Sequence, residues 1–430
     1  MRKPLAGLRV LDVGTRIAAP FCAGILGEQG AEVIKIEQPG TGDPMRTIGP
    51  FANPGDEPPA GEGSDHPYSL FWAVEGRGRK SVTLDLRQPR GQELFRQLAS
   101  HADVLCENFR PGTLERWNIH PEVLPRRLVT VRISVFGQDG PKSLRPGLDR
   151  NGVAYGGLLH LTGEPDRPPV RPGLTISDYL TGVFASQAAT ALLYERDAGG
   201  TGEGGVIDAY LYGSVLRILE WTHAAYHHLG LVRNRTGNRL DHSAPLDNYP
   251  SRDGRWVCIA AAMETNFARL CTAMDRQDLL DDSKFATAEV RAANGDEINQ
   301  IVARWTAQLD AADIEARCVA HDVPVATAYD AADIAADPHI AARGDLIAID
   351  DPVVGPLNQQ APFPRFDANP PPLPPRAPPP RPPTAEAPTP PPPPIPTGAP
   401  RLGHHTDEVL TALCNLTQDD LASLRAEGII

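Results

Sequence analysis

The first 200 residues alternate between short apolar runs and segments in which apolar residues recur at helical spacing. Apolar runs at 8–13, 32–37, 102–106 and 128–134 predict buried strands, and an alternating run that ends at Leu86 predicts another. Helices are predicted at 20–30, 90–100 and from Thr113. This order favours an α/β fold: a Rossmann-like large domain with a mainly parallel open sheet and helices on both faces.

A further helix is predicted after a short apolar stretch that ends at Ile176. Ser177 and Asp178 are good N-cap residues, and Val183 and Phe184 begin an apolar series at helical spacing. Asp178 is therefore expected among free backbone N–H groups, at the positive end of the helix dipole, where a carboxylate stays ionised. Such a carboxylate is either a helix cap or, if it turns outward, a nucleophile.

The remainder of the chain divides by composition. Residues 1–205 form the amino-terminal part of the large domain, which includes a surface loop at 39–67. The segments that follow are a long helix (209–231) and a linker within 206–250, a smaller α+β domain (251–340), a return segment (341–368), a proline-rich linker (369–400) and a carboxyl-terminal segment (401–430) that packs back on a large domain. Proline fills 18 of the 32 positions at 369–400, which predicts an extended polyproline II spacer.

Charge and cysteine usage exclude several classes of protein. A net charge of −13 argues against nucleic acid as a partner. No apolar run approaches the roughly 18 residues that span a bilayer, and the six scattered cysteines suit reduced thiols in a cytoplasmic enzyme. His223 and His227 have the i, i+4 spacing of zinc ligands, but the sequence offers no third ligand, so no metal is expected.

Candidate binding residues gather at or just beyond the predicted strand ends. They are cations, an amide and an aromatic ring, which suit a phosphorylated, adenine-bearing ligand: Arg77, Arg79, Lys80, Asn108, Phe109 and Arg116. Each of them alone is equally compatible with an ordinary solvated side chain. A nicotinamide cofactor is disfavoured, because the loop after the first strand lacks the G-x-G-x-x-G fingerprint although Glu37 ends the second strand.

Several segments together resemble one family, in the same order along nearly the whole chain apart from the proline-rich stretch. The chain is similar to the family III CoA-transferases, which include formyl-CoA:oxalate and carnitine CoA-transferases and the related α-methylacyl-CoA racemases. The matching segments are Leu8-Arg-Val-Leu-Asp12, Gly30–Glu37 with Gly42-Asp43, Arg79–Leu86, Ala102–Gly112, Phe136-Gly-Gln-Asp-Gly-Pro141, Ser177–Gly182 and Leu402–Leu410.

The resemblance implies a ping-pong reaction at Asp178. The aspartate attacks an acyl-CoA thioester to give a mixed anhydride, the released CoA thiolate converts it to an aspartyl-CoA thioester, and an acceptor carboxylate reverses the sequence. It also implies that Asn108, Phe109 and Arg116 line the CoA site and that Arg79 and Lys80 lie near its phosphates. The expected partners are acyl-CoA and carboxylic acid substrates and a second copy of the chain in an interlocked homodimer, with no permanently bound cofactor.

The sequence also departs from the family pattern. Ile17 replaces a glutamine, Gln38 replaces an arginine, and a glycine-rich flap is missing before Ala260, all of which argue against oxalate or formate chemistry. Leu148 precedes Asp149 where the racemases place a proton-transferring histidine, and leucine cannot exchange a proton. A CoA-transferase is therefore preferred. An acyl-CoA racemase or isomerase of the same fold and a non-catalytic CoA-binding or scaffold protein are the alternatives, and Asp149 either orients its neighbours or caps the next helix.

Overall fold

The computed structural model describes residues 3–52, 68–240, 242–366 and 396–430. Most of the predicted polyproline spacer at 369–400 and the second half of the predicted loop at 39–67 lie outside these ranges. Within the described part of the chain, none of the helices has the length and apolar character needed to cross a bilayer.

The large domain contains a six-stranded sheet in which every neighbouring pair of strands is parallel. The sheet confirms the predicted α/β class. Its strands, in spatial order, are β5 (Arg79–Thr83), β2 (Glu32–Glu37), β1 (Arg9–Asp12), β6 (Val104–Glu107), β7 (Val129–Ser134) and β8 (Val206–Tyr210).

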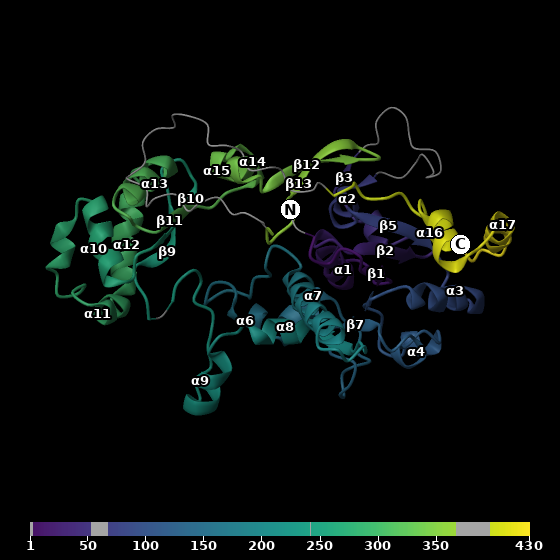
Figure 1. Cartoon of the computed structure of the whole chain (residues 1–430). Coiled ribbons are helices and arrows are strands. Elements are labelled where there is room, and N and C mark those ends of the chain that lie inside the picture. The colour runs from purple at the N-terminus through teal and green to yellow at the C-terminus, as the bar shows by residue number, and fades with distance from the viewer. Residues whose placement is uncertain (1–2, 53–67, 241, 367–395) are drawn as a thin grey trace.

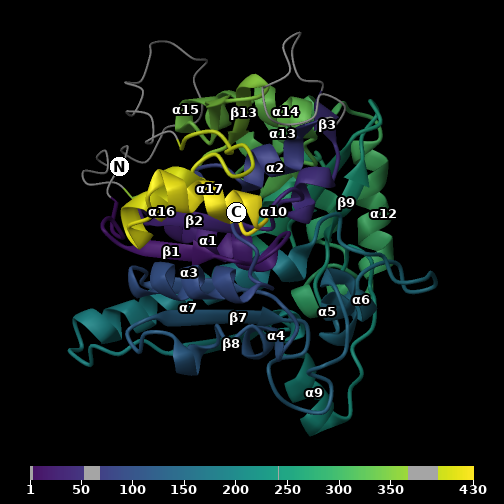
Figure 2. The same ribbon diagram turned by 90° about the vertical axis from the view of Figure 1, so that its right-hand side faces the viewer.

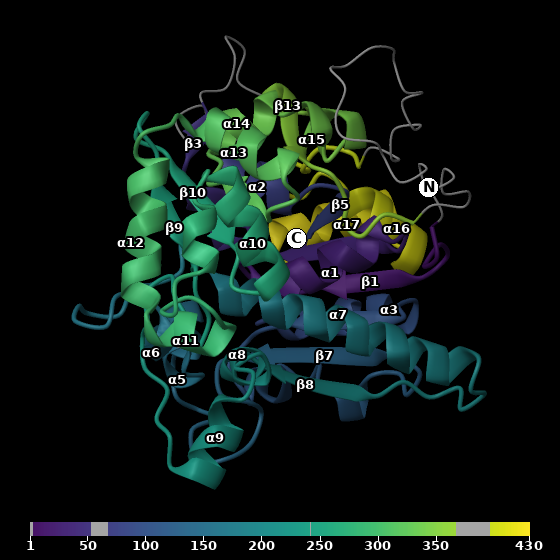
Figure 3. The ribbon, with the colours of Figure 1, turned by 90° about the vertical axis from the view of Figure 1, so that its left-hand side faces the viewer.

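Helices cover both faces of this sheet because alternate residues of each strand point to opposite sides. In β2, Ile34 and Ile36 face α3 (Pro89–Ser100), α16 (Thr406–Cys414) and α17 (Gln418–Ala426), the helices in front of the sheet in Figure 2. Val33 faces the opposite core, which α1 (Ala18–Glu28) and α7 (Ile176–Asp197) supply. Figure 3 shows this second face, with α7 running beside α1.

The close contact between α7 and α1 depends on a glycine. A Cβ atom at Gly182 would lie 2.9 Å from the Phe21 ring and 3.0 Å from the Ala18 carbonyl oxygen, so α7 can approach α1 this closely only without a side chain there. Tyr179, one helical turn earlier, packs edge-on against Phe21 and donates a hydrogen bond to Glu75. These contacts fix the amino-terminal turn of α7, which contains Asp178.

The region predicted as one long helix at 209–231 is different in the structure. Val206–Tyr210 is the edge strand β8, and two short helices follow, α8 (Leu211–Arg217) and α9 (Thr222–Leu229). Glu220 between them has a φ of 51°, which an α-helix cannot accommodate. The prediction failed because the apolar residues of β8 lead directly into those of α8 without an intervening turn.

The smaller domain is built on an antiparallel sheet with its own core, at the opposite end of the molecule from α17 (Figure 1). Its strands are β9 (Leu246–Pro250), β10 (Trp256–Ala260) and β11 (Val325–Thr327). Four helices pack with them: α10 (Glu264–Ala273), α11 (Ala288–Ala293), α12 (Gly295–Thr306) and α13 (Ala311–Ala320).

The segment after the smaller domain leads back to the large one. It contains α14 (Ala331–Ala336), α15 (Pro338–Arg343) and a hairpin of β12 (Leu346–Asp351) and β13 (Gly355–Gln360) that the sequence analysis did not predict. Asp351 accepts a hydrogen bond from Tyr68, and residues 396–430 then lie beside β5, where His405 accepts one from the Ser81 amide.

The remaining elements are short: η1 (Pro44–Thr47), β3 (Phe51–Ala52), β4 (Tyr68–Ser69), α2 (Leu70–Glu75), α4 (Thr113–Arg116), η2 (Pro121–Val123), α5 (Asp149–Tyr155), α6 (Leu158–Leu161) and η3 (Gln277–Leu280).

Candidate functional site

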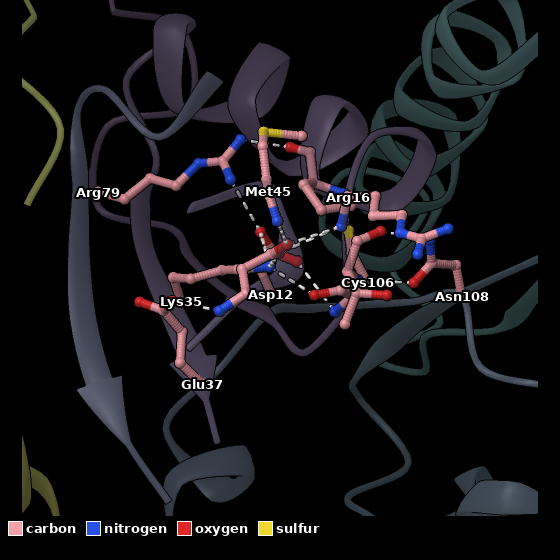
Figure 4. Close-up of polar contacts among 12 residues, drawn as sticks. Asp12, Arg16, Lys35, Glu37, Met45, Arg79, Cys106 and Asn108 are labelled. Atoms are coloured by element: carbon pink, nitrogen blue, oxygen red, sulfur yellow. Dashed lines mark hydrogen bonds and ion pairs between the residues drawn. The ribbon is translucent and has the colours of Figure 1, made fainter. Parts of the chain in front are cut away.

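The loop after β1 is held by a buried cluster of charges (Figure 4). Lys35 forms ion pairs with Asp43 at 2.9 Å and Asp12 at 3.4 Å and also donates to the Gly14 carbonyl. Burial disfavours the Lys35 charge, but the two carboxylates outweigh it and raise the pKa of Lys35. The ammonium group therefore stays protonated, and its contacts with Asp12, Asp43 and the Gly14 carbonyl hold the loop in place.

Asp43 turns the main chain of this loop toward a pocket. Its carboxylate accepts hydrogen bonds from the Arg16 amide at 3.0 and 3.2 Å, and Arg16 has a φ of 62°. Burial opposes the Asp43 charge, but Lys35 and backbone amides outweigh it and lower the pKa of Asp43. A permanently ionised acid thus stabilises a left-handed conformation that residues other than glycine rarely adopt.

The loop after β6 is joined to the loop after β1 by Asn108. Its amide group donates to the Thr15 carbonyl and accepts from the Thr15 amide, both at 2.8 Å. Gly14 permits this closeness, because a Cβ atom there would lie 2.7 Å from the Ala19 Cβ atom and 3.2 Å from Asn108 Oδ1. The next residue, Phe109, packs edge-on against Trp117 with ring centroids 5.0 Å apart.

Glu107 fixes the direction in which Phe109 leaves β6. The carboxylate accepts from the Phe109 amide at 2.7 Å and from Arg132 at 2.8 Å, and Arg132 also binds Glu115 in α4. Burial raises the pKa of Glu107 to about 7 although Arg132 opposes the shift. These contacts connect β6, β7 and α4 and so support the loop that contains Asn108 and Phe109.

Asp178 lies in the first turn of α7 rather than at its N-cap, which is Thr175. The predicted capping role is instead filled by Asp149, whose Oδ1 atom accepts from the Ser177 amide at 2.9 Å and from the Ser177 hydroxyl at 2.7 Å. Asp149 itself is the first residue of α5, so its side chain orients a neighbouring helix and does not cap its own. Asp178 is thereby left without a hydrogen-bond partner in the described part of the chain.

The expectation that Asp178 stays ionised was wrong for this structure. Burial, followed by repulsion from Asp149, raises its pKa to about 7, and attraction by Arg16 only partly counteracts the shift. The helix dipole argument failed because Asp178 is partly buried and accepts no capping hydrogen bond. Near neutral pH the carboxyl group is therefore balanced between its two protonation states.

Asp178 opens into a cavity of about 580 Å³. The lining comes from the loops after β1, β6 and β7 and from the amino-terminal turns of α5 and α7. It includes Thr15, Arg16, Ile17, Asn108, Phe109, Arg110, Arg145, Leu148, Asp149, Arg150, Arg171 and Asp178. A smaller cavity of about 100 Å³ adjoins it at Thr15 and Phe109 and reaches Gln38, Arg87 and Trp117. Two predicted binding residues, Asn108 and Phe109, thus share one pocket with Asp178.

The other predicted binding residues lie elsewhere. Arg79 and Lys80 are the first two residues of β5 and lie at its amino-terminal end, whereas Asn108 and Phe109 follow the carboxyl-terminal end of β6. Arg79 is buried and pairs with Asp12 at 3.1 Å, and Lys80 pairs with Glu32 and Glu408. Arg116 is exposed at the end of α4 and donates to Thr113.

The sequence analysis missed the arginines of the pocket. Arg16, Arg110, Arg145, Arg150 and Arg171 all line it and are exposed. They come from separate loops, so no local spacing connects them. The available signal was weaker: Arg16 lies directly after a predicted strand, and Arg145 and Arg150 flank the loop in which Leu148 replaces the racemase histidine. Within the described ranges, no group of three or more His, Cys, Asp or Glu side chains converges as a metal site.

Comparison with known proteins identifies the chain's relatives. Two CoA-transferases from Chloroflexus aurantiacus are each 38% identical: succinyl-CoA–D-citramalate CoA-transferase, over 100% of this chain and 98% of the relative, and the β subunit of succinyl-CoA–L-malate CoA-transferase, over 99% and 98%. The crystal structure of a CaiB/BaiF family protein from Brucella suis superimposes with a TM-score of 0.79 at 29% identity, covering 96% of this chain and all of that one. The family model for CoA-transferase family III matches residues 5–381. The chain therefore belongs to CoA-transferase family III and is an enzyme that transfers CoA between an acyl-CoA and a carboxylic acid.

Proposed function

We propose that CoA transfer proceeds through covalent catalysis by Asp178. The observation that carries the proposal is the environment of its carboxyl group, which opens into the 580 Å³ cavity and lacks a hydrogen-bond partner among the described residues. A carboxylate that is desolvated and unshared is a better nucleophile than one held in an ion pair. Asp12 and Asp43 are paired with Lys35, whereas Asp178 forms no ion pair within the described ranges, which distinguishes it from these structural acids.

In the proposed reaction a carboxylate oxygen of Asp178 attacks the thioester carbonyl carbon. The C–S bond breaks, CoA leaves as its thiolate, and a mixed anhydride forms. The thiolate then attacks the Asp178 carbonyl carbon, which releases the donor carboxylate and leaves an aspartyl-CoA thioester. The acceptor carboxylate attacks this thioester, and the released thiolate attacks the acceptor acyl carbon of the second anhydride. Asp178 is regenerated, and no net proton is consumed.

The residues around Asp178 supply binding and orientation in this mechanism. Asn108 provides an amide in the larger cavity, Phe109 provides an aromatic ring that lines both cavities, and Arg116 lies at the end of the following helix. We assign these three residues to the CoA moiety, whose remote contacts orient the thioester. Arg79 and Lys80 we assign a structural role, because both are committed to ion pairs within the protein.

The proposed donor is succinyl-CoA and the proposed acceptor a short dicarboxylic acid. Both Chloroflexus relatives carry succinyl-CoA in their names, and their acceptors, D-citramalate and L-malate, are dicarboxylic acids. The exposed arginines of the cavity provide positive charge for such anions within a chain of net charge −13. We further propose that the working enzyme is a homodimer, as the family resemblance implies.

Chemical trapping tests the covalent role of Asp178. The enzyme is incubated with succinyl-CoA, quenched with hydroxylamine and digested for peptide mass analysis, and we expect a hydroxamate at Asp178. Asp178→Asn should lose the adduct and at least about 1000-fold of the transfer rate, because an amide cannot form the anhydride. Asp166→Asn is the matched control, since Asp166 is exposed and lies outside the cavity. Transfer by Asp178→Asn at the parent rate would refute the mechanism.

The same incubation separates the alternative functions. Deuterium uptake at the α-carbon of the acyl group without an adduct at Asp178 would indicate a racemase or isomerase. CoA binding with neither signal would indicate a scaffold. The replacement of the proton-transferring histidine by Leu148 favours the transferase outcome.

A further inference from the structure

Arg16 has a guanidinium group without an ion pair in the described part of the chain, as do the other arginines that line the cavity of Asp178. Several buried or half-buried arginines elsewhere bind carboxylates, such as Arg46 with Glu37 and Arg132 with Glu107. Within the described part of the chain, the side chain of Arg16 makes neither a hydrogen bond nor an ion pair, and it lines the cavity of Asp178. An unpaired guanidinium in a pocket presents a planar array of donors suited to a carboxylate.

The main chain at Arg16 is held in a strained conformation. Its φ of 62° lies in the left-handed region, which residues other than glycine rarely adopt. The Arg16 amide donates to both carboxylate oxygens of Asp43, which is itself held by a buried ion pair with Lys35, and these contacts maintain the conformation. Both Arg16 and its neighbour Ile17 line the cavity, but Ile17 is buried while Arg16 is exposed and so can reach a ligand there.

Arg16 also lies near the reacting carboxyl group. Arg16 and Asp178 line the same cavity, and the Arg16 charge counteracts part of the rise in the pKa of Asp178. A short acyl chain bound with its thioester at Asp178 would therefore extend past Arg16. A terminal carboxylate on that chain would meet a cation, whereas a terminal methyl group would leave the guanidinium without a carboxylate partner in the cavity.

We propose that Arg16 is a specificity-determining residue that binds the second carboxylate of a dicarboxylic acyl group. This inference rests on the proposed function, because it assumes that the acyl carbon reacts at Asp178. It names the residue that distinguishes a succinyl-type substrate from a monocarboxylic one of equal length. The same contact serves donor and acceptor, since each occupies the site in its own half of the ping-pong cycle.

The experiment compares succinyl-CoA with butyryl-CoA, which has the same chain length and no second carboxylate. In Arg16→Gln we expect kcat/KM for succinyl-CoA to fall by about 100-fold and that for butyryl-CoA by less than about 3-fold, because only the former loses a charge-assisted hydrogen bond. Arg16→Lys should be more active with succinyl-CoA than Arg16→Gln but less active than the parent, because lysine restores the positive charge without the planar pair of N–H donors of a guanidinium group. Arg304→Gln, at an exposed arginine of the smaller domain outside the cavity, is the control and should leave both substrates unchanged.

Measurements at pH 9 remove a competing explanation. Loss of the Arg16 charge also raises the pKa of Asp178, but at pH 9 Asp178 is ionised in parent and variant alike. A succinyl-CoA defect that persists at pH 9 supports recognition. A defect that disappears there, or that affects both substrates equally, would overturn the Arg16 assignment. Neither result touches the covalent mechanism, which is judged separately by trapping at Asp178 and by the Asp178→Asn variant.

Discussion

At the scale of single residues, the raised pKa of Asp178 makes activity depend on pH near neutrality. The nucleophile must be ionised, and its pKa is about 7, so kcat/KM should rise with pH through that value. At pH 6 we expect about one tenth of the plateau value measured at pH 8.5. The profile of kcat/KM for succinyl-CoA between pH 5.5 and 8.5 checks this, and a flat profile over that range would contradict it.

The Asp149→Asn variant tests the cause of this shift. Asp149 is the neighbouring charge that raises the pKa of Asp178, after burial itself. Asparagine can still accept the hydrogen bonds from Ser177, so α7 should remain anchored while the repulsion disappears. The midpoint of the profile should then move to lower pH. An unchanged midpoint would assign the whole shift to burial.

The identity of the central residues was predictable from the sequence, but their electrostatic state was not. Asn108 and Phe109 follow a predicted strand and Asp178 lies at the start of a predicted helix, so the sequence pattern placed all three at one edge of the sheet. The pKa of Asp178 depends on burial and on Asp149, 29 positions earlier in the chain. Arg16 was missed because its exposed position depends on hydrogen bonds to Asp43, which no local pattern reveals.

At the scale of elements, the approach of α7 to α1 should control both stability and activity. A valine at Gly182 would place its Cβ atom 2.9 Å from Phe21 and 3.0 Å from the Ala18 carbonyl oxygen, and its branches would add further clashes. We expect Gly182→Val to lower the free energy of unfolding by about 1–3 kcal/mol. We also expect kcat to fall by at least about tenfold. Asp178 lies about one helical turn before Gly182, so a displaced α7 would carry it out of position.

Gln187→Val on the same helix is the matched control. Gln187 is exposed, so a β-branched residue there costs only a few tenths of a kcal/mol of helix propensity. Thermal or urea unfolding of both variants measures the stability difference, and succinyl-CoA turnover measures the effect on the site. Equal behaviour of the two variants would show that the α1–α7 contact is not limiting.

Elements whose own residues show a clear pattern were predicted with nearly correct bounds. Elements that form only by pairing with a distant segment were not predicted. The strand at 32–37 has the same bounds in the structure, because Val33, Ile34 and Ile36 supply apolar side chains to the cores on both faces of the sheet. The sequence analysis predicted no strand at Val206–Tyr210, the residues of β8. Only pairing with β7 makes this segment extended. The β12–β13 hairpin was missed although Leu346–Asp351 alternates between buried and partly exposed residues.

At the scale of the whole molecule, one side of the large domain leaves apolar groups uncovered. Val183 and Phe184 of α7, Val206 of β8 and Leu216 of α8 are each 38–55% exposed. They flank a cavity of about 240 Å³ between α7 and the edge strand β8. Clustered apolar side chains beside an unpaired strand edge are typical of a protein–protein interface. This surface is therefore the expected contact region of the proposed homodimer.

The dimer predicts a solution mass about twice the 46.3 kDa of the chain. Light scattering coupled to size-exclusion chromatography should show this mass for the parent and a shift toward the monomer for Phe184→Asp, because a buried carboxylate without a partner opposes association. Val319→Asp introduces the same charge at an exposed apolar position of the smaller domain and should leave the mass unchanged.

Since Phe184 lies in the same helix as Asp178, separation of the subunits should also loosen the first turn of α7 and lower CoA transfer. A fully active monomer of Phe184→Asp would show that each chain holds a complete site.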